Sequence, residues 1–219
     1  MSLHYFENGY YIPFIFVLIY FFQKDLFLAT IISLKLFQAN YYYHFSYVYN
    51  YLPGNFNMLQ QFVRYTDSGH LISFLYYLFP NLICLAFNIH FVITLGYWIS
   101  RIFFNLEDTD DRITILNQTF LNFWITCNHS IPLILLIYEL SKIQNKDILF
   151  TNNDLYFSYL WSYTWLVFIY LPWRLVTNDP VYSVLSDEKP IYMKLSLFLL
   201  IKSLLLYSNI FGWYLIKFI

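Results

Sequence analysis

Four polar side chains recur at helical spacing inside one long apolar stretch of this sequence. They are Thr119, Asn122, Thr126 and His129, separated by three, four and three residues. Such spacing places all four on one face of an α-helix. Beyond His129 the same face becomes apolar, so the polar stripe covers only half of the expected helix.

A second stripe of the same kind occurs earlier in the chain. Thr66, His70, Ser73 and Tyr77 follow one another at intervals of four, three and four residues. Ionisable and polar groups inside a bilayer are costly and tend to face the interior of a helix bundle. The two stripes are therefore where function should be sought.

A hydroxyl beside an imidazole can act as a nucleophile with its general base. The imidazole takes the proton as the oxygen attacks a carbonyl carbon, and returns it to the leaving group. With a helix start near Phe56, Thr66 lies ten residues into its helix, and His129 lies ten residues after Thr119, so the two could meet at one depth with His129 as base. We expect His70, Ser73, Asn122 and Thr126 to line the site. His70, one turn from Thr66, is a rival base. Candidate donors to an oxyanion are Asn122, Asn128 and Arg64.

The same residues also have a purely structural interpretation. Ser and Thr in membrane helices commonly donate to carbonyls of their own helix, and polar side chains hold neighbouring helices together. A non-catalytic scaffold or complex subunit would place Thr66 and His129 far apart or facing different neighbours. Separation of about 6 Å or less between the two side chains, facing a cavity, would favour catalysis, because hydrogen-bond reach then needs only small adjustment.

The composition of the chain predicts an all-α, polytopic bundle of transmembrane helices. Of 219 residues, 59% are hydrophobic and only 11% charged, whereas soluble domains have about 25% charged residues. Continuous apolar runs exclude the alternation of a transmembrane barrel. We expect about five to seven spans, with six or seven preferred, in a single integral membrane domain over residues 1–219.

Apolar stretches separated by short polar breaks give the expected spans. A turn at Pro53-Gly54-Asn55 and an acidic loop at 105–117 separate some of them, and Pro80 is either a turn or a kink. The expected helices cover about 10–22, 26–47, a segment starting between Phe56 and Arg64 and ending near Pro80, 82–104, 119–140, 156–176 and 191–218.

Several classes of site are disfavoured by the sequence. Cys84 and Cys127 lie in apolar runs and suit packing as small hydrophobes. The chain lacks a basic patch of nucleic-acid type, a glycine-rich phosphate loop and any histidine or cysteine motif for metal. We therefore expect no cofactor, metal or nucleic acid, and membrane lipids as the surroundings.

The sequence resembles the FAR-17a and androgen-induced family of multi-pass membrane proteins. The resemblance covers residues 26–219, and residues 1–25 then form an additional N-terminal span. The connection between the third and fourth helices is shorter than family members usually have. The matching motifs are Arg64-Tyr65-Thr66 before Phe74-Leu75-Tyr76-Tyr77, and His129 followed by Pro132-Leu133 and Glu139, with weaker matches at Gly96-Tyr97-Trp98, Trp165 and Val181-Tyr182.

The resemblance implies a function as well as a fold. The family includes membrane hydrolases that cleave fatty acid esters of hydroxy fatty acids with a threonine nucleophile and a histidine base. Carried over by motif, Thr66 is the nucleophile and His129 the base, in an internal membrane such as the endoplasmic reticulum. A transporter or channel is the other alternative, and it predicts a polar path across the whole membrane and inverted repeats.

Overall fold

The computed structural model describes residues 11–23, 25–44, 62–104, 115–178, 180–182 and 185–219. Every regular element within these ranges is helical, which confirms the all-α prediction. The elements are α2 Tyr11–Gln23, α3 Leu26–His44, α4 Tyr65–Leu78, η2 Pro80–Leu82, α5 Ile83–Phe104, α6 Ile115–Ser141, α7 Asn152–Trp165, η3 Leu166–Tyr170, α8 Leu171–Thr177 and α9 Ile191–Leu215.

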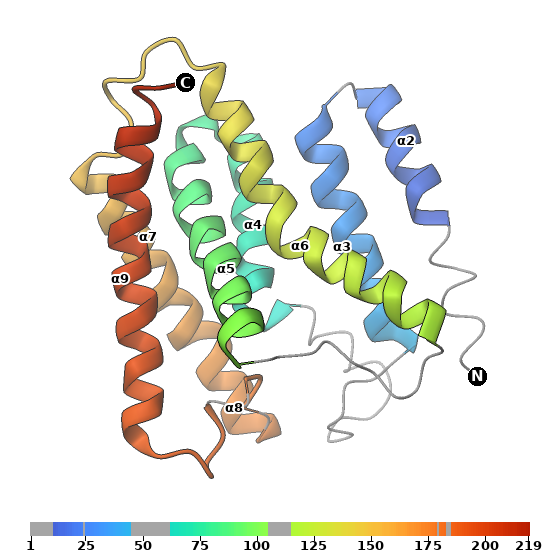
Figure 1. Ribbon diagram of the computed structural model, residues 1–219, viewed down its shortest axis with the longest axis vertical. Coiled ribbons are helices and arrows are strands. Elements are labelled where there is room, and N and C mark those ends of the chain that lie inside the picture. Colours follow the sequence, from blue (N-terminus) through green and yellow to red (C-terminus); the bar gives the residue numbers. More distant parts are fainter. Residues whose placement is uncertain (1–10, 24, 45–61, 105–114, 179, 183–184) are drawn as a thin grey trace.

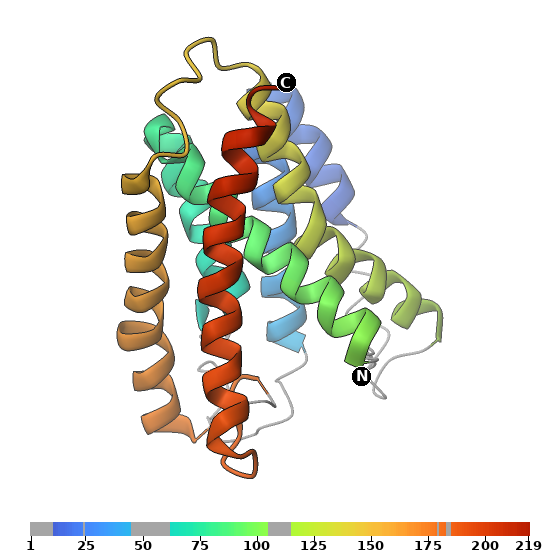
Figure 2. The same cartoon turned by 60° about the vertical axis from the view of Figure 1, so that its left-hand side comes forward.

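Successive helices run up and down through one bundle. Figure 1 shows α2, α4, α6 and α9 running in one direction and α3, α5 and α7 in the other. The segments α7, η3 and α8 follow one another without a break, η3 being a π-helical stretch within them. After a rotation of the view, α7 and α9 lie side by side, and α6 crosses the other helices obliquely (Figure 2).

Three of the described helices are long and apolar enough to cross a membrane. They are Pro80–Phe103, Leu121–Ser141 and Ile191–Leu215, and Leu26–Ala39 is a shorter apolar helix. A hydrocarbon core of about 30 Å requires about 20 residues of helix. Membrane insertion is therefore supported by three helices, and the larger number of spans stays a prediction.

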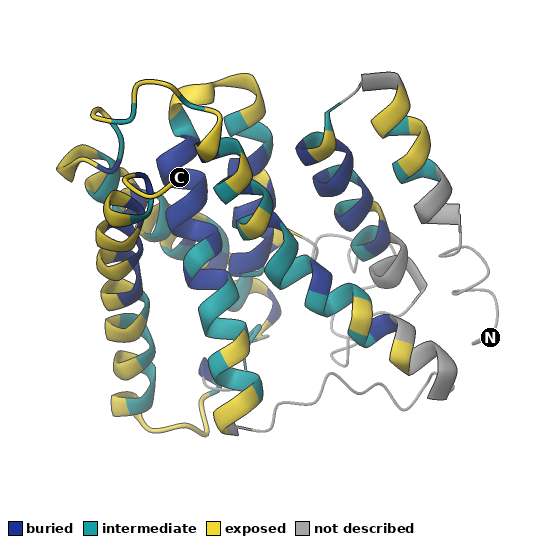
Figure 3. Ribbon diagram, turned by 45° about the horizontal axis from the view of Figure 1, so that its top comes forward, coloured by how far each residue is buried: buried dark blue, intermediate teal, exposed yellow. Residues whose placement is uncertain are grey.

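The helix α5 forms the centre of the bundle. It packs against α4, α6, α7 and α9, and its first eight residues, 83–90, are all buried (Figure 3). Four buried polar side chains join it to α7 and α9, since the Asn88 amide donates to Ser158 and Asn209 while Ser208 donates to Asn88. Hydrogen bonds of this kind hold helices together where lipid offers no hydrophobic driving force.

Two expectations about helix boundaries change. The third expected helix begins at Tyr65, not between Phe56 and Arg64, and Pro80 marks a turn between antiparallel helices, since α4 ends at Leu78. The fifth begins at Ile115, within the stretch expected to be an acidic loop. The predicted turn at Pro53-Gly54-Asn55 and residues 105–114 of that loop lie outside the described residues.

Candidate active site

The first turn of α4 carries Thr66. Helix α4 begins at Tyr65 because the backbone of Arg64 is extended and its N–H donates to the Asp67 carboxylate at 2.8 Å. An acidic side chain at this position satisfies one amide at the helix start and favours the positive end of the helix dipole. Thr66 is therefore the second residue of the helix.

This position corrects the depth expected for Thr66. The expected helix starts put Thr66 and His129 each ten residues inside a helix, whereas Thr66 is in the first turn of α4 and His129 is the fifteenth residue of α6. The two residues nevertheless meet because α6 crosses α4 obliquely (Figures 1 and 2). The matching depth was wrong, and the expected proximity does not depend on it.

Thr66 and His129 form a hydroxyl–imidazole pair. Thr66 Oγ1 lies 3.3 Å from His129 Nε2, well inside the 6 Å that we set as the limit. His129 Nδ1 lies 2.7 Å from the carbonyl oxygen of Ile125. Because a carbonyl only accepts, Nδ1 carries the proton, and in the neutral ring Nε2 is left as an acceptor facing the hydroxyl.

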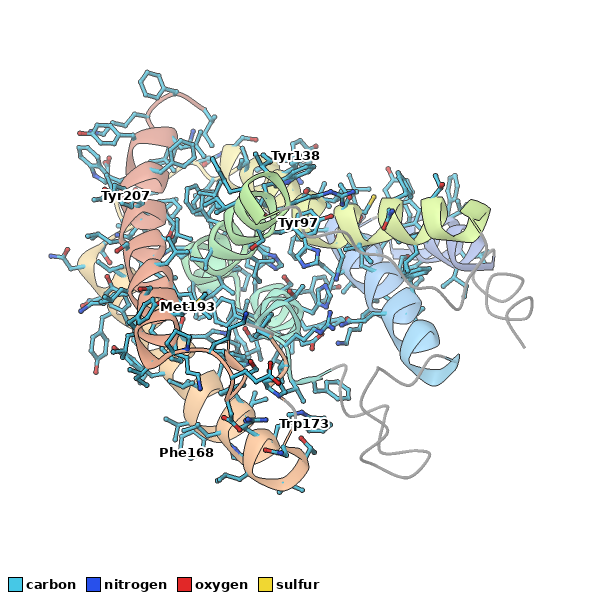
Figure 4. The ribbon with its side chains drawn as sticks, turned by 60° about the horizontal axis from the view of Figure 1, so that its bottom comes forward. Tyr97, Tyr138, Phe168, Trp173, Met193 and Tyr207 are labelled. Atoms are coloured by element: carbon cyan, nitrogen blue, oxygen red, sulfur yellow. The ribbon has the colours of Figure 1, made fainter. Side chains whose placement is uncertain are left out.

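Helix α5 fixes the orientation of the imidazole. The ring of Tyr97 stacks on that of His129, with centroids 4.2 Å apart and planes 12° from parallel. Figure 4 labels Tyr97 where α5 meets α6. The Thr94 hydroxyl donates to the backbone carbonyl of His129 at 2.5 Å. Arg101 donates to the hydroxyl of Tyr97, which lies 3.2 Å from Thr126 Oγ1.

The chain around Thr66 is also held by α7 and by the segment before α9. Trp165 Nε1 donates to the carbonyl of Val63 at 2.8 Å, and the Tyr65 N–H donates to the Tyr182 hydroxyl at 2.8 Å. Tyr182 follows Val181, whose φ of 61° is unusual for a β-branched residue. Burial raises the pKa of Tyr182 to about 12, so its hydroxyl stays protonated at neutral pH.

A second hydroxyl–imidazole pair lies further along α4. Ser73 Oγ lies 2.8 Å from His90 Nε2, and both side chains are buried. The Ser73 hydroxyl donates to the Gly69 carbonyl at 2.9 Å, and His90 Nε2 lies 3.0 Å from the same oxygen. A Cβ at Gly69 would lie 2.5 Å from Ile93 Cδ1, so a larger residue there would have to displace the end of that side chain.

The remaining predicted site residues have other surroundings. His70 Nε2 lies 2.6 Å from the side-chain oxygen of Asn128, so His70 is engaged with α6 and not with Thr66. Asn122 is half-buried on α6, about 10 Å along the helix from His129. Tyr77 and Thr119, the outer members of the two stripes, are exposed.

The described part of the chain has no candidate metal centre at the pair. No three His, Cys, Asp or Glu side chains there are arranged to hold a metal ion. A shallow pocket lies near the start of α7, away from Thr66. Its lining residues are Phe150, Thr151, Asn152, Asn209, Ile210, Trp213 and Tyr214.

Two residues at the Thr66 turn, Lys35 and Asp67, were not among the predicted site residues. Lys35 of α3 is an ion-pair partner of Asp67 at 3.1 Å. A lysine within an apolar helix is itself a signal, because such groups in membranes are rare and usually paired. Asp67 is three residues after Arg64, the spacing of a helix N-terminal cap. Neither of these sequence features indicates which helix carries the residue that pairs with Lys35 or with Asp67.

Sequence and structural comparisons do not identify a family for this chain. Comparison with protein-family models, with curated proteins and with solved structures finds no match in any of the three.

Proposed function

We propose that this protein is a lipid ester hydrolase embedded in an internal membrane, with Thr66 as nucleophile and His129 as general base. The observation that carries the proposal is the 3.3 Å contact between Thr66 Oγ1 and His129 Nε2, with Nδ1 held by the carbonyl of Ile125. This arrangement leaves the lone pair of Nε2 directed at the hydroxyl proton.

The reaction proceeds in two steps through an acyl-threonine. Thr66 Oγ1 attacks the ester carbonyl carbon while His129 Nε2 takes the hydroxyl proton. The tetrahedral intermediate collapses, the bond from carbon to the alcohol oxygen breaks, and the imidazolium returns its proton to the departing alcohol. Water then attacks the threonyl ester with His129 again as base, which releases the carboxylic acid and restores Thr66.

The resemblance described above supports a lipid substrate. Among its weaker matches, Tyr97 stacks on His129, Trp165 donates to the carbonyl of Val63, and Tyr182 accepts from the N–H of Tyr65. Residues far apart in the sequence thus converge on one pair. Glu139 does not join them, because it pairs with Lys142 at the end of α6. We propose fatty acid esters of hydroxy fatty acids as substrates.

The surroundings of the pair constrain how a substrate reaches it. Thr66 is only 8% exposed. An acyl carbonyl therefore reaches Oγ1 only after neighbouring side chains move, and it arrives through the bilayer between helices. We propose that five to seven of the helices span the membrane, in the endoplasmic reticulum, with the pair near one end of the bundle, since Thr66 opens α4.

The geometry favours this function over the two alternatives. A scaffold predicts that Thr66 and His129 lie apart, and their side chains are in hydrogen-bond contact. A transporter predicts a polar path across the membrane. The polar stripe on α6 becomes apolar beyond His129, and no inverted repeat is visible in the sequence.

The test is hydrolysis of acyl esters by the purified protein in detergent or vesicles. Thr66→Ala and His129→Ala are each expected to abolish turnover. Mass spectrometry after acid quenching should find an acyl group on Thr66 when the ester is supplied. Turnover that survives both substitutions would refute the proposal, as would an acyl group on any other residue.

A further inference from the structure

We infer that Lys35 and Gln38 of α3 are positioning residues that hold Thr66 at His129 by clamping Asp67. The inference rests on the proposed function, and it assigns a role to an ion pair that the chemistry of ester cleavage does not itself require. Neither α3 residue touches the reacting atoms, so their effect would act through Asp67 on the first turn of α4.

The Asp67 carboxylate receives donors from two helices. Lys35 Nζ lies 3.1 Å from Oδ1, and Gln38 Nε2 donates to the same oxygen at 2.6 Å. The other oxygen, Oδ2, accepts the N–H of Arg64 at 2.8 Å. Lys35 Nζ also donates to Gln38 Oε1 at 3.1 Å, which joins the two donors on α3. One carboxylate thus links α3 to Arg64, two residues before Thr66, and Asp67 is itself the residue after Thr66.

Burial makes the connection of Asp67 to Lys35 and Gln38 rigid. The side chain of Asp67 is 1% exposed and that of Lys35 is 16% exposed. A buried charge that loses its partner is strongly unfavourable, because little water is present to replace it. Asp67 therefore cannot leave Lys35 and Gln38 without a large free-energy penalty, and the adjacent Thr66 is held with it.

A second helix cap in the same chain shows that capping alone does not need the α3 residues. Asp154 occupies the equivalent position of α7, where its Oδ2 accepts the N–H of Thr151 at 2.7 Å. Its other hydrogen bonds at this helix start are also with Thr151, the N-cap residue of α7. The difference at Asp67 is the connection to another helix.

The length of the catalytic contact makes the position of the turn matter. At 3.3 Å, Thr66 Oγ1 and His129 Nε2 are already near the outer limit of a hydrogen bond. Displacement of a catalytic group by about 1 Å can lower a rate by about 100-fold. A turn released from α3 would therefore lose catalysis before it lost the helix.

Steady-state kinetics of four variants test the inference. Lys35→Met and Gln38→Leu are expected to lower kcat by at least tenfold and about threefold, with KM changed less than twofold. Lys35→Arg, which keeps the charge and the donors, should restore most of the activity. Asp154→Asn is the matched control, because it weakens the equivalent cap of α7, and it should leave kcat unchanged. If Lys35→Met does not fold, the uncharged Gln38→Leu variant decides the kinetic test.

A second measurement does not depend on hydrolysis. In a background with Cys84 and Cys127 replaced by Ala, Thr66→Cys introduces a thiol at the proposed nucleophile. Its alkylation by iodoacetamide should be accelerated by His129, and Lys35→Met should reduce that acceleration at least threefold.

The outcomes separate the two proposals. If hydrolysis depends on Thr66 and His129 but Lys35→Met and Gln38→Leu behave like Asp154→Asn, the clamp is wrong and the proposed function stands. If no ester is cleaved, the proposed function fails and the alkylation rate alone decides the clamp. Equal alkylation rates with and without Lys35→Met would overturn it.

Discussion

Helix α4 carries two hydroxyl–imidazole pairs that differ in which atom holds the proton. In Thr66 with His129, the carbonyl of Ile125 fixes the proton on Nδ1 and leaves Nε2 free to accept from the hydroxyl. In Ser73 with His90, the hydroxyl donates to the backbone, and Nε2 faces only acceptors. His90 Nε2 must therefore carry the proton, and it cannot act as base toward Ser73.

The comparison teaches that residue type and proximity do not define a nucleophile with its base. The Ser73 pair has the shorter contact, 2.8 Å against 3.3 Å, and the less crowded hydroxyl. The nearest backbone carbonyl decides the difference. In the Thr66 pair, the carbonyl accepts from the imidazole nitrogen that faces away from the hydroxyl, so the nitrogen that faces the hydroxyl can serve as a base. In the Ser73 pair, the carbonyl accepts from both the hydroxyl and the nitrogen that faces it, so the pair only joins two helices.

The largest expected effect separates the two hydroxyls by activity. Thr66→Val keeps the shape of the side chain without its oxygen, and we expect kcat/KM to fall at least about 10³-fold, because the proposed nucleophile is lost. Ser73→Ala should stay within about threefold of the unchanged protein. The measurement is ester hydrolysis by both variants at equal concentrations of folded protein. The reverse ranking would make Ser73 the nucleophile and the comparison would fail.

For stability, the imidazole of His90 should matter more than that of His129, the opposite of the order expected for activity. His90 is fully buried, so His90→Ala leaves a cavity and unpaired polar groups, and we expect a loss of about 2–4 kcal/mol in the free energy of unfolding. His129 is only half-buried, and His129→Ala should cost about 1 kcal/mol. Unfolding by denaturing detergent measures both. Equal losses would mean that the Thr66 pair is as structural as the Ser73 pair.

Stacking on the imidazole should matter only at the Thr66 pair. Tyr97→Leu removes the ring that packs on His129, and we expect kcat to fall about tenfold because the imidazole can turn away from Thr66. Tyr97→Phe keeps the ring and should lose less than threefold. Kinetics of the two variants side by side distinguish stacking from the hydroxyl contacts of Tyr97. A larger loss in Tyr97→Phe would assign the effect to the hydroxyl.

The smallest expected effect concerns support from outside the helix. Thr66 lies in a first turn whose amides lack partners within the helix, and Tyr182 accepts one of them, whereas Ser73 lies within the helix. Tyr182→Phe should therefore cost about 1 kcal/mol in the free energy of unfolding. Unfolding at neutral pH checks this value, and no loss would show that the amide has another acceptor.

The pH dependence of stability provides a further check on Tyr182. Its pKa in the folded protein is about 12, above the usual value of 10, so burial favours the protonated phenol. The contribution of Tyr182 is therefore fully present below pH 10 and is lost as pH rises toward 12. Tyr182→Phe should flatten this part of the stability profile. An unchanged slope would mean that other tyrosines account for it.

Several features could be predicted from the sequence because they depend on local periodicity. Apolar stretches of sufficient length gave the helices, and spacings of three and four residues gave the faces of α4 and α6. The start of α4 was misplaced because the signal for it, the carboxylate of Asp67 on the N–H of Arg64, is a short-range hydrogen bond and not a periodic pattern. The long apolar helices were located correctly from the apolar stretches of the sequence.

The sequence by itself determined that the chain is helical and rich in apolar stretches, and that Thr66 and His129 each lie on a polar face. Among the described helices, three are long and apolar enough to cross a membrane. Only the tertiary structure decided that the two side chains meet, because periodicity along a helix carries no information about the angle at which two helices cross. It also decided which imidazole nitrogen faces the hydroxyl, and that Lys35 of α3 pairs with Asp67 beside Thr66. Those choices depend on contacts between residues distant in the chain.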